Sequence, residues 1–195
     1  MTTGALTLAR ETTALLDTLG IDYVIGGSVA SSLVGEPRAT IDLDLAVTLA
    51  TDQVAPLLEA LAGAYYASER AVHDAVQRRS SFNVIHLETM QKVDLFVLGD
   101  GLLDRLQMAR RQEVFLDEAG THRLWVGSPA DQVLGKLWWF RLGNEVSERQ
   151  WRDVLAILRV QGAGLDLADL RSTAQAEDLT DLLERALAEA GLTSP

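Results

Sequence analysis

The segment RATIDLDLAV, residues 38–47, contains two aspartates inside an alternating run of apolar residues. An apolar side chain recurs at every second position, and Asp42 and Asp44 fall between these positions. Successive side chains of a β-strand point to opposite faces, so the pattern predicts a half-buried strand over residues 41–47. Both carboxylates then lie on one face, one strand repeat apart, where they can share divalent cations.

A glycine turn precedes this strand. The apolar run at residues 23–25 is typical of a short buried strand, Gly26 and Gly27 follow it, and a helix is expected over residues 28–34. Glycines at the start of a helix let backbone N–H groups approach a phosphate closely, and the helix dipole favours negative charge there. Ser28 adds a hydroxyl donor, so all three residues of this turn are predicted to bind nucleotide.

A third carboxylate, Asp94, lies in another apolar stretch. Residues 92–98 read as a strand, which is expected to form a hairpin with a strand over residues 82–87. Mg²⁺ prefers oxygen ligands and is usually held by a few carboxylates together with substrate phosphates. With Asp42 and Asp44, this residue is therefore predicted to complete a site for Mg²⁺ or Mn²⁺.

Taken in order, these motifs resemble the nucleotidyltransferase superfamily, and within it the minimal bacterial type grouped with the AbiEii abortive-infection toxins. The resemblance runs over residues 20–160. It implies an α/β (α+β) fold with a five-stranded mixed sheet flanked by helices, followed by a C-terminal helical bundle. It also implies transfer of a nucleoside monophosphate from an NTP to an acceptor hydroxyl. Asp42 and Asp44 would bind both metals, and Asp94 would bind the catalytic metal and help deprotonate the acceptor.

The resemblance also implies nucleotide contacts outside the glycine turn. Arg38 precedes the Asp-x-Asp strand and would contact phosphates or hold that strand. Lys136 lies on a later helix and would contact the nucleotide phosphates, and the pair Arg152-Asp153 would open a further helix. From the residues alone, Lys136 is equally well interpreted as a lysine whose stem covers its apolar neighbours.

The rest of the chain divides into two parts. Before Ser128-Pro129, strand and helix patterns alternate, which is typical of an α/β or α+β domain. After it the chain reads as helical, because Ser128 caps and Pro129 opens a helix. We therefore expect a nucleotidyltransferase-like domain over residues 1–127 and a helical subdomain over residues 128–195. Expected helices cover residues 6–19, 51–61 (with Thr51 as the N-cap), 69–79, 101–111, 128–142, 145–160, 167–173 and 178–190, and short strands cover 114–116 and 123–126.

Composition narrows the class of protein. With 17 basic and 28 acidic residues, the net charge of −11 disfavours broad, non-specific nucleic-acid binding. The chain has no cysteine, so disulfides and thiolate zinc sites are excluded. Its first 20 residues do not form a signal peptide, and no apolar run approaches the ~20 residues of a membrane span. These features predict a cytoplasmic protein without a membrane segment.

The acceptor and the preferred NTP stay open. A protein side chain, a tRNA end and a small hydroxylated molecule such as an aminoglycoside are all compatible with the motifs, although the acidic composition disfavours RNA. One alternative is a non-catalytic partner, or a nucleotide-binding module, of a toxin–antitoxin-type system with a protein partner. Another is a structural α/β domain whose carboxylates are only solvated.

Several aromatic residues and histidines have structural interpretations. The cluster Trp138-Trp139-Phe140 is either core between helices, which is favoured, or a stacking platform for a base or an acceptor. Trp125 and Trp151 are expected in the core or between the two parts of the chain. The three histidines show no metal-ligand spacing and are expected to be structural or exposed; they are His73, His86 and His122.

Overall fold

The computed structural model describes residues 3–27, 29–30, 42–115 and 123–192 of the chain. In this part of the chain, one sheet has the strand order β3-β4-β5-β2-β1-β7-β6. The strands are β1 (Tyr23–Ile25), β2 (Leu43–Val47), β3 (Tyr65–Ala67), β4 (Ser81–His86), β5 (Lys92–Val97), β6 (Gln112–Phe115) and β7 (Arg123–Val126).

The sheet is mixed, as predicted. Strand β2 pairs in parallel with β5 and antiparallel with β1, and β1 pairs in parallel with β7. The described residues form seven strands rather than the expected five. The β6–β7 hairpin extends the sheet beyond β1, and β3 adds an edge strand that was not expected. Three residues are too few to show an alternating pattern, so β3 left no signal in the sequence.

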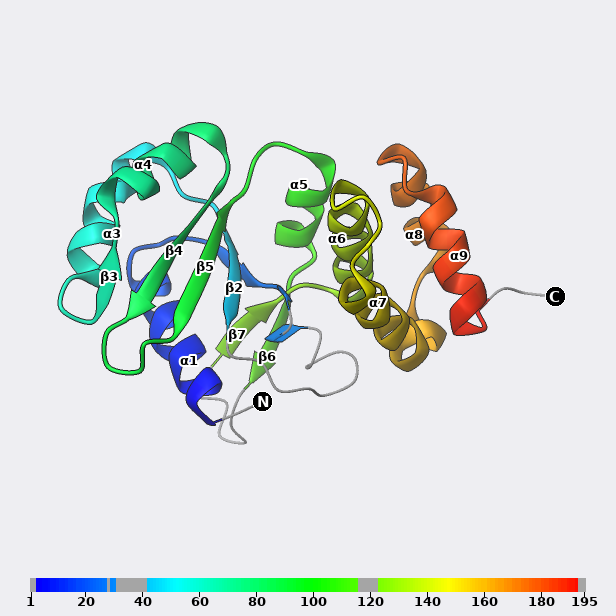
Figure 1. Ribbon diagram of the computed structural model, residues 1–195, viewed down its shortest axis with the longest axis horizontal. Helices are drawn as coiled ribbons and strands as arrows, with labels where there is room; N and C mark the ends of the chain where they lie inside the picture. The colour runs from blue at the N-terminus through cyan, green and yellow to red at the C-terminus, as the bar shows by residue number, and fades with distance from the viewer. Residues whose placement is uncertain (1–2, 28, 31–41, 116–122, 193–195) are drawn as a thin grey trace.

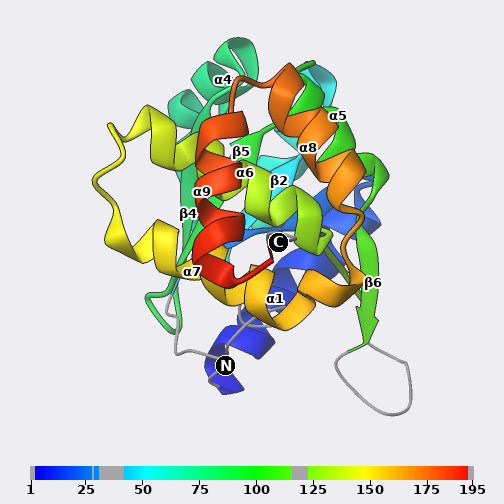
Figure 2. The ribbon, with the colours of Figure 1, turned by 90° about the vertical axis from the view of Figure 1, so that its right-hand side faces the viewer.

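One group of helices covers one face of the sheet, and a second group packs beside the opposite face. They are α1 (Thr3–Thr18), α3 (Val54–Leu61), α4 (Glu69–Arg78), α5 (Leu102–Ala109), α6 (Pro129–Leu142), α7 (Glu148–Gln161), α8 (Leu167–Ala176) and α9 (Thr180–Ala190), with 3₁₀ turns η1 (Thr51–Gln53) and η2 (Gly162–Gly164). Figure 1 shows α1, α3 and α4 at one end and α5 to α9 at the other. Viewed from the right-hand side, α6 to α9 lie in front of the sheet (Figure 2).

The two central strands have one buried and one half-open face. Burial alternates strictly along β2 and along β5, so that Leu45 and Leu95, for example, are buried. These side chains belong to one apolar core with residues of α1, α3 and α4. The residues between them, Asp44, Asp94 and Phe96 among them, lie on the opposite face and are only partly buried. We call this second face the open face.

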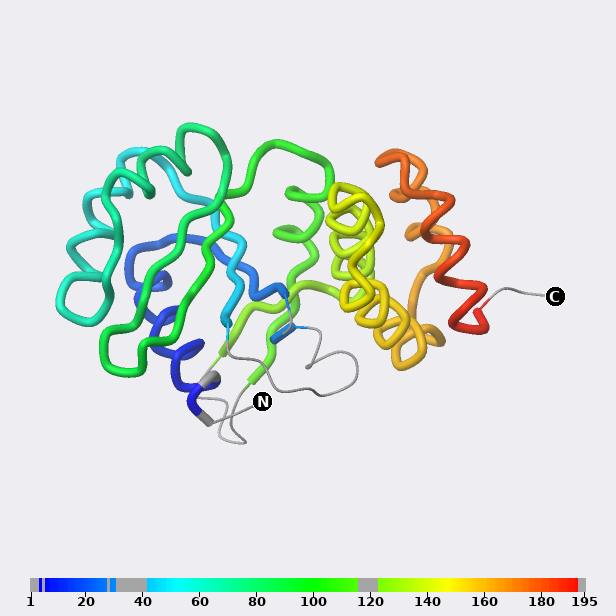
Figure 3. Tube along the Cα trace, viewed as in Figure 1, coloured from blue at the N-terminus to red at the C-terminus, as the bar shows by residue number. Residues whose placement is uncertain are grey.

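The C-terminal helices have a core of their own. Buried residues of α6 to α9 form a second apolar cluster, in which Leu134 and Leu137 are fully buried. Burial of such a side chain contributes about 1.5–3 kcal/mol, so this cluster is a substantial source of stability. Along the Cα trace the blue-to-green part and the yellow-to-red part occupy different ends of the molecule (Figure 3). The domain boundary near residue 127 stays a prediction.

Helix starts show which capping predictions held. Ser128 caps α6, because its hydroxyl accepts a hydrogen bond from the Asp131 N–H at 3.2 Å, and Pro129 is the first helical residue. Thr51 is not the N-cap that was expected. It is the first residue of a 3₁₀ turn, where the Gln53 side chain accepts from the Ala50 N–H. In the described ranges, no helix is both long enough and apolar enough to cross a membrane.

Candidate active site

Two of the three predicted carboxylates lie side by side on the open face. Strands β2 and β5 are neighbours, and their register pairs Asp44 with Asp94. The side chain of Asp94 is 22% exposed. Asp42 directly precedes β2 and is exposed. The alternating pattern thus predicted the face correctly, and the strand pairing adds that the second and third carboxylates are at the same level of the sheet.

The glycine turn packs directly against Asp44. The Gly26 N–H donates to the Asp44 backbone carbonyl at 3.0 Å, and the Ala30 N–H donates to the Gly26 carbonyl at 3.1 Å. Gly27 has φ +57°, and a Cβ atom on it would lie 1.8 Å from Asp44 Oδ2. Only glycine fits there, since any side chain would occupy the space of this carboxylate. Helical backbone begins at Gly27. Ser28 lies outside the described residues.

Lys92 is part of the site, and the sequence analysis missed it. Its Nζ lies 2.7 Å from Asp94 Oδ2, and its side chain is 43% exposed. The hydrogen bond to Asp94 raises the pKa of Lys92, and the negative charges of Asp94, Asp42 and Asp44 add to this effect. A signal was present: Lys92 precedes Asp94 by two residues on an alternating strand and therefore shares its face.

The donor atoms suit a divalent cation, although the carboxylates are not gathered around one point. Carboxylate oxygens are the ligands that Mg²⁺ prefers, and the ammonium of Lys92 already lies in the field of all three aspartates. Within the described ranges, however, no three His, Cys, Asp or Glu side chains form a metal-binding group. The residues thus fit a metal by chemistry, with Asp94 engaged by a lysine instead.

Lys136 makes an interhelical ion pair. Its Nζ lies 3.0 Å from Oδ2 of Asp153 on α7, and the two side chains are only 14% and 12% exposed. Its ammonium is therefore held between helices, which corrects the alternative interpretation of a lysine that covers its apolar neighbours with its stem and extends its charge into solvent. Asp153 lies in the second turn of α7, which begins at Glu148, so the pair Arg152-Asp153 does not open that helix. The predicted phosphate contact of Lys136 stays a prediction, and Arg38 lies outside the described residues.

The aromatic cluster of α6 divides into core and surface. Phe140 is buried, with its ring centroid 5.2 Å from that of the buried Trp151. Trp138 and Trp139 are 36% and 49% exposed, so the core interpretation was wrong for these two residues. Trp139 packs edge-to-face on Phe96 at 6.0 Å and on Trp138 at 4.9 Å. Phe96, Trp138 and Trp139 form what we call the aromatic wall.

The aromatic wall borders the carboxylates. Phe96 is two residues beyond Asp94 on β5 and lies on the same open face. Trp139 brings α6 against that face, and Lys136, three residues earlier, occupies the same side of the helix. The site therefore has a glycine turn on the β1 side of the carboxylates, and aromatic rings beyond them along β5.

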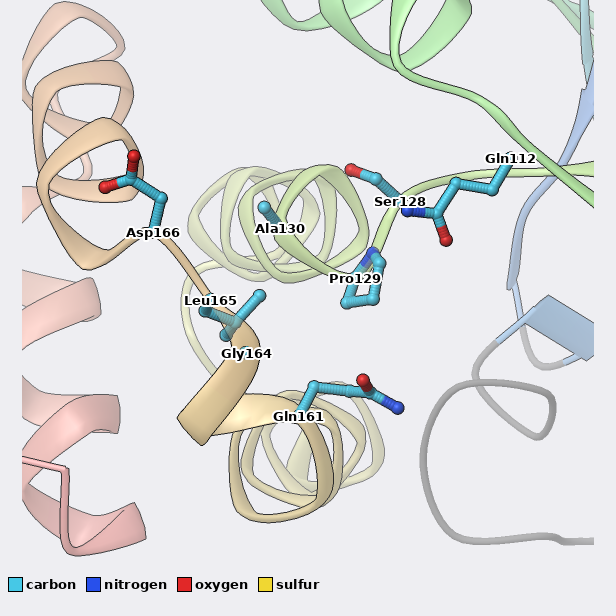
Figure 4. Close-up of a pocket in the computed structure, with 8 residues that line it drawn as sticks. All are labelled: Gln112, Ser128, Pro129, Ala130, Gln161, Gly164, Leu165 and Asp166. Atoms are coloured by element: carbon cyan, nitrogen blue, oxygen red, sulfur yellow. The ribbon is translucent and has the colours of Figure 1, made fainter.

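A separate pocket lies away from these residues. It has a volume of about 280 Å³ and lies where α6 begins, α7 ends and α8 begins, with Gln112, Ser128, Gln161 and Asp166 among its lining residues (Figure 4). None of the predicted site residues lines it. Its polar groups also have structural roles, since Ser128 caps α6 and Asp166 caps α8. We therefore do not include this pocket in the candidate active site.

The histidines that can be placed are structural or exposed. His86 is buried, packs on Tyr65 at 5.1 Å between ring centroids, and hydrogen-bonds through Nδ1 to Thr89 Oγ1 at 2.9 Å. His73 is on the surface of α4, 4.0 Å from Glu69. His122 lies outside the described residues.

Comparisons with known proteins bear on the fold. No protein-family model matches the sequence, and no curated protein matches it. Solved structures do match. An antigenic nucleotidyltransferase-like protein from Paracoccidioides brasiliensis aligns over 94% of this chain and 90% of its own, with a TM-score of 0.56 and 19% identity.

Two further solved structures have a similar architecture. ANT(2″)-Ia in complex with adenylyl-2″-tobramycin aligns over 90% of this chain and 99% of its own, with a TM-score of 0.61 and 14% identity. The lincosamide antibiotic adenylyltransferase LnuA, bound to lincomycin, aligns over 80% of this chain and 96% of its own, with a TM-score of 0.52 and 13% identity. At such identities the likeness concerns the fold, and the chain therefore has a nucleotidyltransferase-like fold.

Proposed function

We propose that the protein is a metal-dependent nucleotidyltransferase that moves a nucleoside monophosphate from an NTP to an acceptor hydroxyl. The observation that carries this proposal is the juxtaposition of Asp44 with both Gly27 and Asp94. A turn that admits only glycine lies against one carboxylate, and a second carboxylate is level with it on the next strand. This arrangement lets backbone N–H groups approach a phosphate beside the carboxylates.

The residues divide the reaction between two sides of Asp44. On the β1 side, backbone N–H groups at the start of the helix after Gly26 would hold the phosphates of the donor. On the β5 side, Asp94 would accept the proton of the acceptor hydroxyl. The acceptor oxygen then bonds to the α-phosphorus while the bond to the bridging oxygen breaks, and pyrophosphate leaves. Mg²⁺ or Mn²⁺ held by Asp42, Asp44 and Asp94 would neutralise phosphate charge and lower the pKa of the attacking hydroxyl.

The aromatic wall supports a small-molecule acceptor. Phe96 and Trp139 lie beyond Asp94 along the open face, and rings that are at least partly exposed can bind flat or ring-shaped faces of ligands. A net charge of −11 does not favour a polyanionic acceptor such as tRNA. Two proteins of the same fold carry small antibiotics in their structures, adenylyl-2″-tobramycin and lincomycin. A hydroxylated small molecule is therefore the acceptor class that we propose.

The first test is thermal unfolding of the full chain with Mg²⁺ or Mn²⁺ and each of the four NTPs. Saturation at about 100 times Kd adds roughly 2.7 kcal/mol, which corresponds to roughly 5–10 °C for a chain of this length. We expect such a shift for at least one NTP in the wild type and none in Asp44→Asn. Asp52→Asn removes an exposed carboxylate of η1 and should behave like the wild type.

Turnover is the second test. Transfer of the label from α-labelled NTPs to hydroxylated acceptors would be measured together with release of pyrophosphate, beginning with an aminoglycoside and a lincosamide. Turnover that survives Asp44→Asn would overturn the proposal. Metal-dependent NTP binding without turnover of any acceptor would instead favour the alternative, a non-catalytic nucleotide-binding module or partner in a toxin–antitoxin-type system. We also propose that the protein is bacterial and cytoplasmic.

A further inference from the structure

We propose that Lys92 is an internal counter-ion, which holds the carboxylate set in the metal-free protein and must move away before a divalent cation binds. The inference rests on the proposed function, because it assigns the metal to Asp42, Asp44 and Asp94. It adds a regulation of that site: the metal has to displace a cation that the chain itself supplies.

The position of Lys92 follows from the strand register. Leu43 pairs with Val93, so Lys92 on β5 is level with Asp42, which directly precedes the neighbouring strand β2. Two residues further along, Asp44 and Asp94 pair directly. The lysine thus lies at one end of the carboxylate group and reaches along its own strand to Asp94, with 2.7 Å between Nζ and Oδ2.

The charges explain why a lysine is stable there. Three aspartates on one face repel one another, and an ammonium among them reduces that repulsion. Lys92 Nζ lies 2.7 Å from Asp94 Oδ2, and the strand register places Lys92 level with Asp42 and two residues from the level of Asp44, so all three carboxylates attract this ammonium. A single positive charge still leaves the group negative, and the site keeps its attraction for a divalent cation.

The same contact blocks a metal. A lysine ammonium has three donors and no acceptor, so it occupies Asp94 Oδ2 and offers no ligand to a metal in return. A divalent cation close to the ammonium would also be repelled by it. The lysine stem is flexible and the side chain is 43% exposed, so the ammonium can move into solvent when a metal arrives. Among the described residues, the three carboxylates share a face but do not form a metal-binding group as they stand.

Binding of a nucleotide together with the metal favours displacement of Lys92 from Asp94. Mg²⁺ is usually held by one or two carboxylates together with substrate phosphates, so a metal that arrives with an NTP brings further oxygen ligands. A metal alone has only the carboxylates, and it competes with Lys92 for Asp94. The protein should therefore bind a bare divalent cation weakly, and Lys92 should be the reason.

The test is direct Mn²⁺ binding to the full chain without nucleotide, measured from the electron paramagnetic resonance signal of free Mn²⁺. Lys92→Met removes the charge and keeps most of the stem, and it should bind Mn²⁺ about three- to tenfold more tightly than the wild type. Lys92→Arg keeps the charge and should bind no more tightly than the wild type. Arg70→Met removes one positive charge from α4, where the side chain is 93% exposed, and should leave Mn²⁺ binding unchanged.

Several results would overturn the inference. Equal or weaker Mn²⁺ binding by Lys92→Met would do so, as would the absence of Mn²⁺ binding in every variant, or tighter binding that persists in Lys92→Met/Asp94→Asn. Weaker Mg²⁺–NTP binding by Lys92→Met, without tighter Mn²⁺ binding, would make the lysine a phosphate contact instead. Circular dichroism and the melting temperature would show that each variant is folded.

Failure of the inference and failure of the proposed function give different results. If Lys92→Met tightens Mn²⁺ binding while no NTP is ever turned over, the counter-ion role stands and the transferase assignment falls. If NTP turnover depends on Asp44 while Mn²⁺ binding ignores Lys92, the transferase assignment stands and the counter-ion role falls. The Mn²⁺ measurement requires no acceptor and can be interpreted before one is known.

Discussion

The chain has two lysines, and each forms an ion pair with an aspartate in a different environment. On the open face, Lys92 and Asp94 are 2.7 Å apart, with side chains that are 43% and 22% exposed. Between α6 and α7, Lys136 and Asp153 are 3.0 Å apart, with side chains that are 14% and 12% exposed. The two nitrogen–oxygen distances are similar, but the Lys136–Asp153 pair is much less exposed to solvent than the Lys92–Asp94 pair. The first pair can exchange its cation for another, whereas the second is committed to holding two helices together.

The aromatic residues of α6 differ in solvent exposure in the same way, and this difference predicts the largest effect on stability. Phe140→Ala should destabilise the protein by about 3–5 kcal/mol, because the ring is buried in the second core and its loss leaves a cavity. Trp139→Ala should cost about 1 kcal/mol or less, since the ring is 49% exposed and packs edge-to-face on Phe96 and on the exposed Trp138. Urea unfolding measures both.

A functional measurement sharpens this comparison. If the aromatic wall binds the acceptor, Trp139→Ala should raise the KM for the acceptor severalfold while the melting-temperature shift with NTP stays as in the wild type. A large loss of stability in Trp139→Ala would show that the wall is part of the core after all. A weakened NTP response would place the donor, instead of the acceptor, against the rings.

Sequence patterns predicted the faces of strands better than the faces of α6. Along β2 the alternation of apolar and polar residues has a single solution, so the position of Asp44 on one face of the strand was predicted. Asp94 was predicted to lie on a strand, and the pairing of β5 with β2 shows that it lies beside Asp44. Along α6 apolar residues occur on every side of the helix, because one part packs in the second core and another part packs on the sheet. No periodicity distinguishes Phe140 from Trp139 in such a helix.

Contacts between distant segments were also beyond the sequence. The motif order predicted that the glycine turn and the carboxylates would meet, but not that Gly27 would leave no space for a Cβ atom beside Asp44. Lys92 was not predicted because a lysine ammonium has no acceptor and is therefore no candidate for a metal ligand. A lysine two residues from a predicted metal ligand on the same strand is a signal that can be sought in other sequences.

The second prediction breaks the interhelical pair. Lys136→Met leaves Asp153 largely buried without this cation, and Asp153→Asn leaves Lys136 in the same position, so each should cost about 2–3 kcal/mol after allowance for partial exposure. The double variant Lys136→Met/Asp153→Asn should be less destabilised than the sum of the two single variants, because it removes both charges. Additive losses in urea unfolding would contradict the interpretation of this contact as a charge pair.

The third prediction breaks the pair on the open face. Lys92→Met should change the free energy of unfolding by less than about 1 kcal/mol, because an exposed ion pair contributes little and is screened by salt. The comparison with Lys136→Met is the measurement that matters, since both variants remove one lysine charge from the same protein. Equal losses would mean that solvation does not distinguish the two pairs, and would remove the physical basis for an exchangeable cation at Asp94.

The last prediction has the smallest expected effect on stability. It concerns a carboxylate that lacks a close lysine partner. Asp131 in the first turn of α6 has a side chain that is 3% exposed, and it accepts a hydrogen bond from the Ser128 hydroxyl at 2.6 Å while Arg110 remains 3.7 Å away. Burial raises the pKa of Asp131 above its ordinary value of 3.8, and the Ser128 hydrogen bond and Arg110 only partly oppose this.

The sign of the pH dependence follows from that shift. Above pH 3.8 the folded protein keeps a proton on Asp131 that the unfolded chain has released, so the contribution of this group to stability falls as pH rises through its folded pKa. Asp131→Asn cannot ionise, and its free energy of unfolding should therefore fall less than that of the wild type between about pH 4 and pH 7, with Asp52→Asn as the exposed control. Parallel pH profiles for the wild type and Asp131→Asn would show that Arg110 fully compensates this buried carboxylate, and that a guanidinium 3.7 Å away can do in the helical bundle what Lys92 does on the open face.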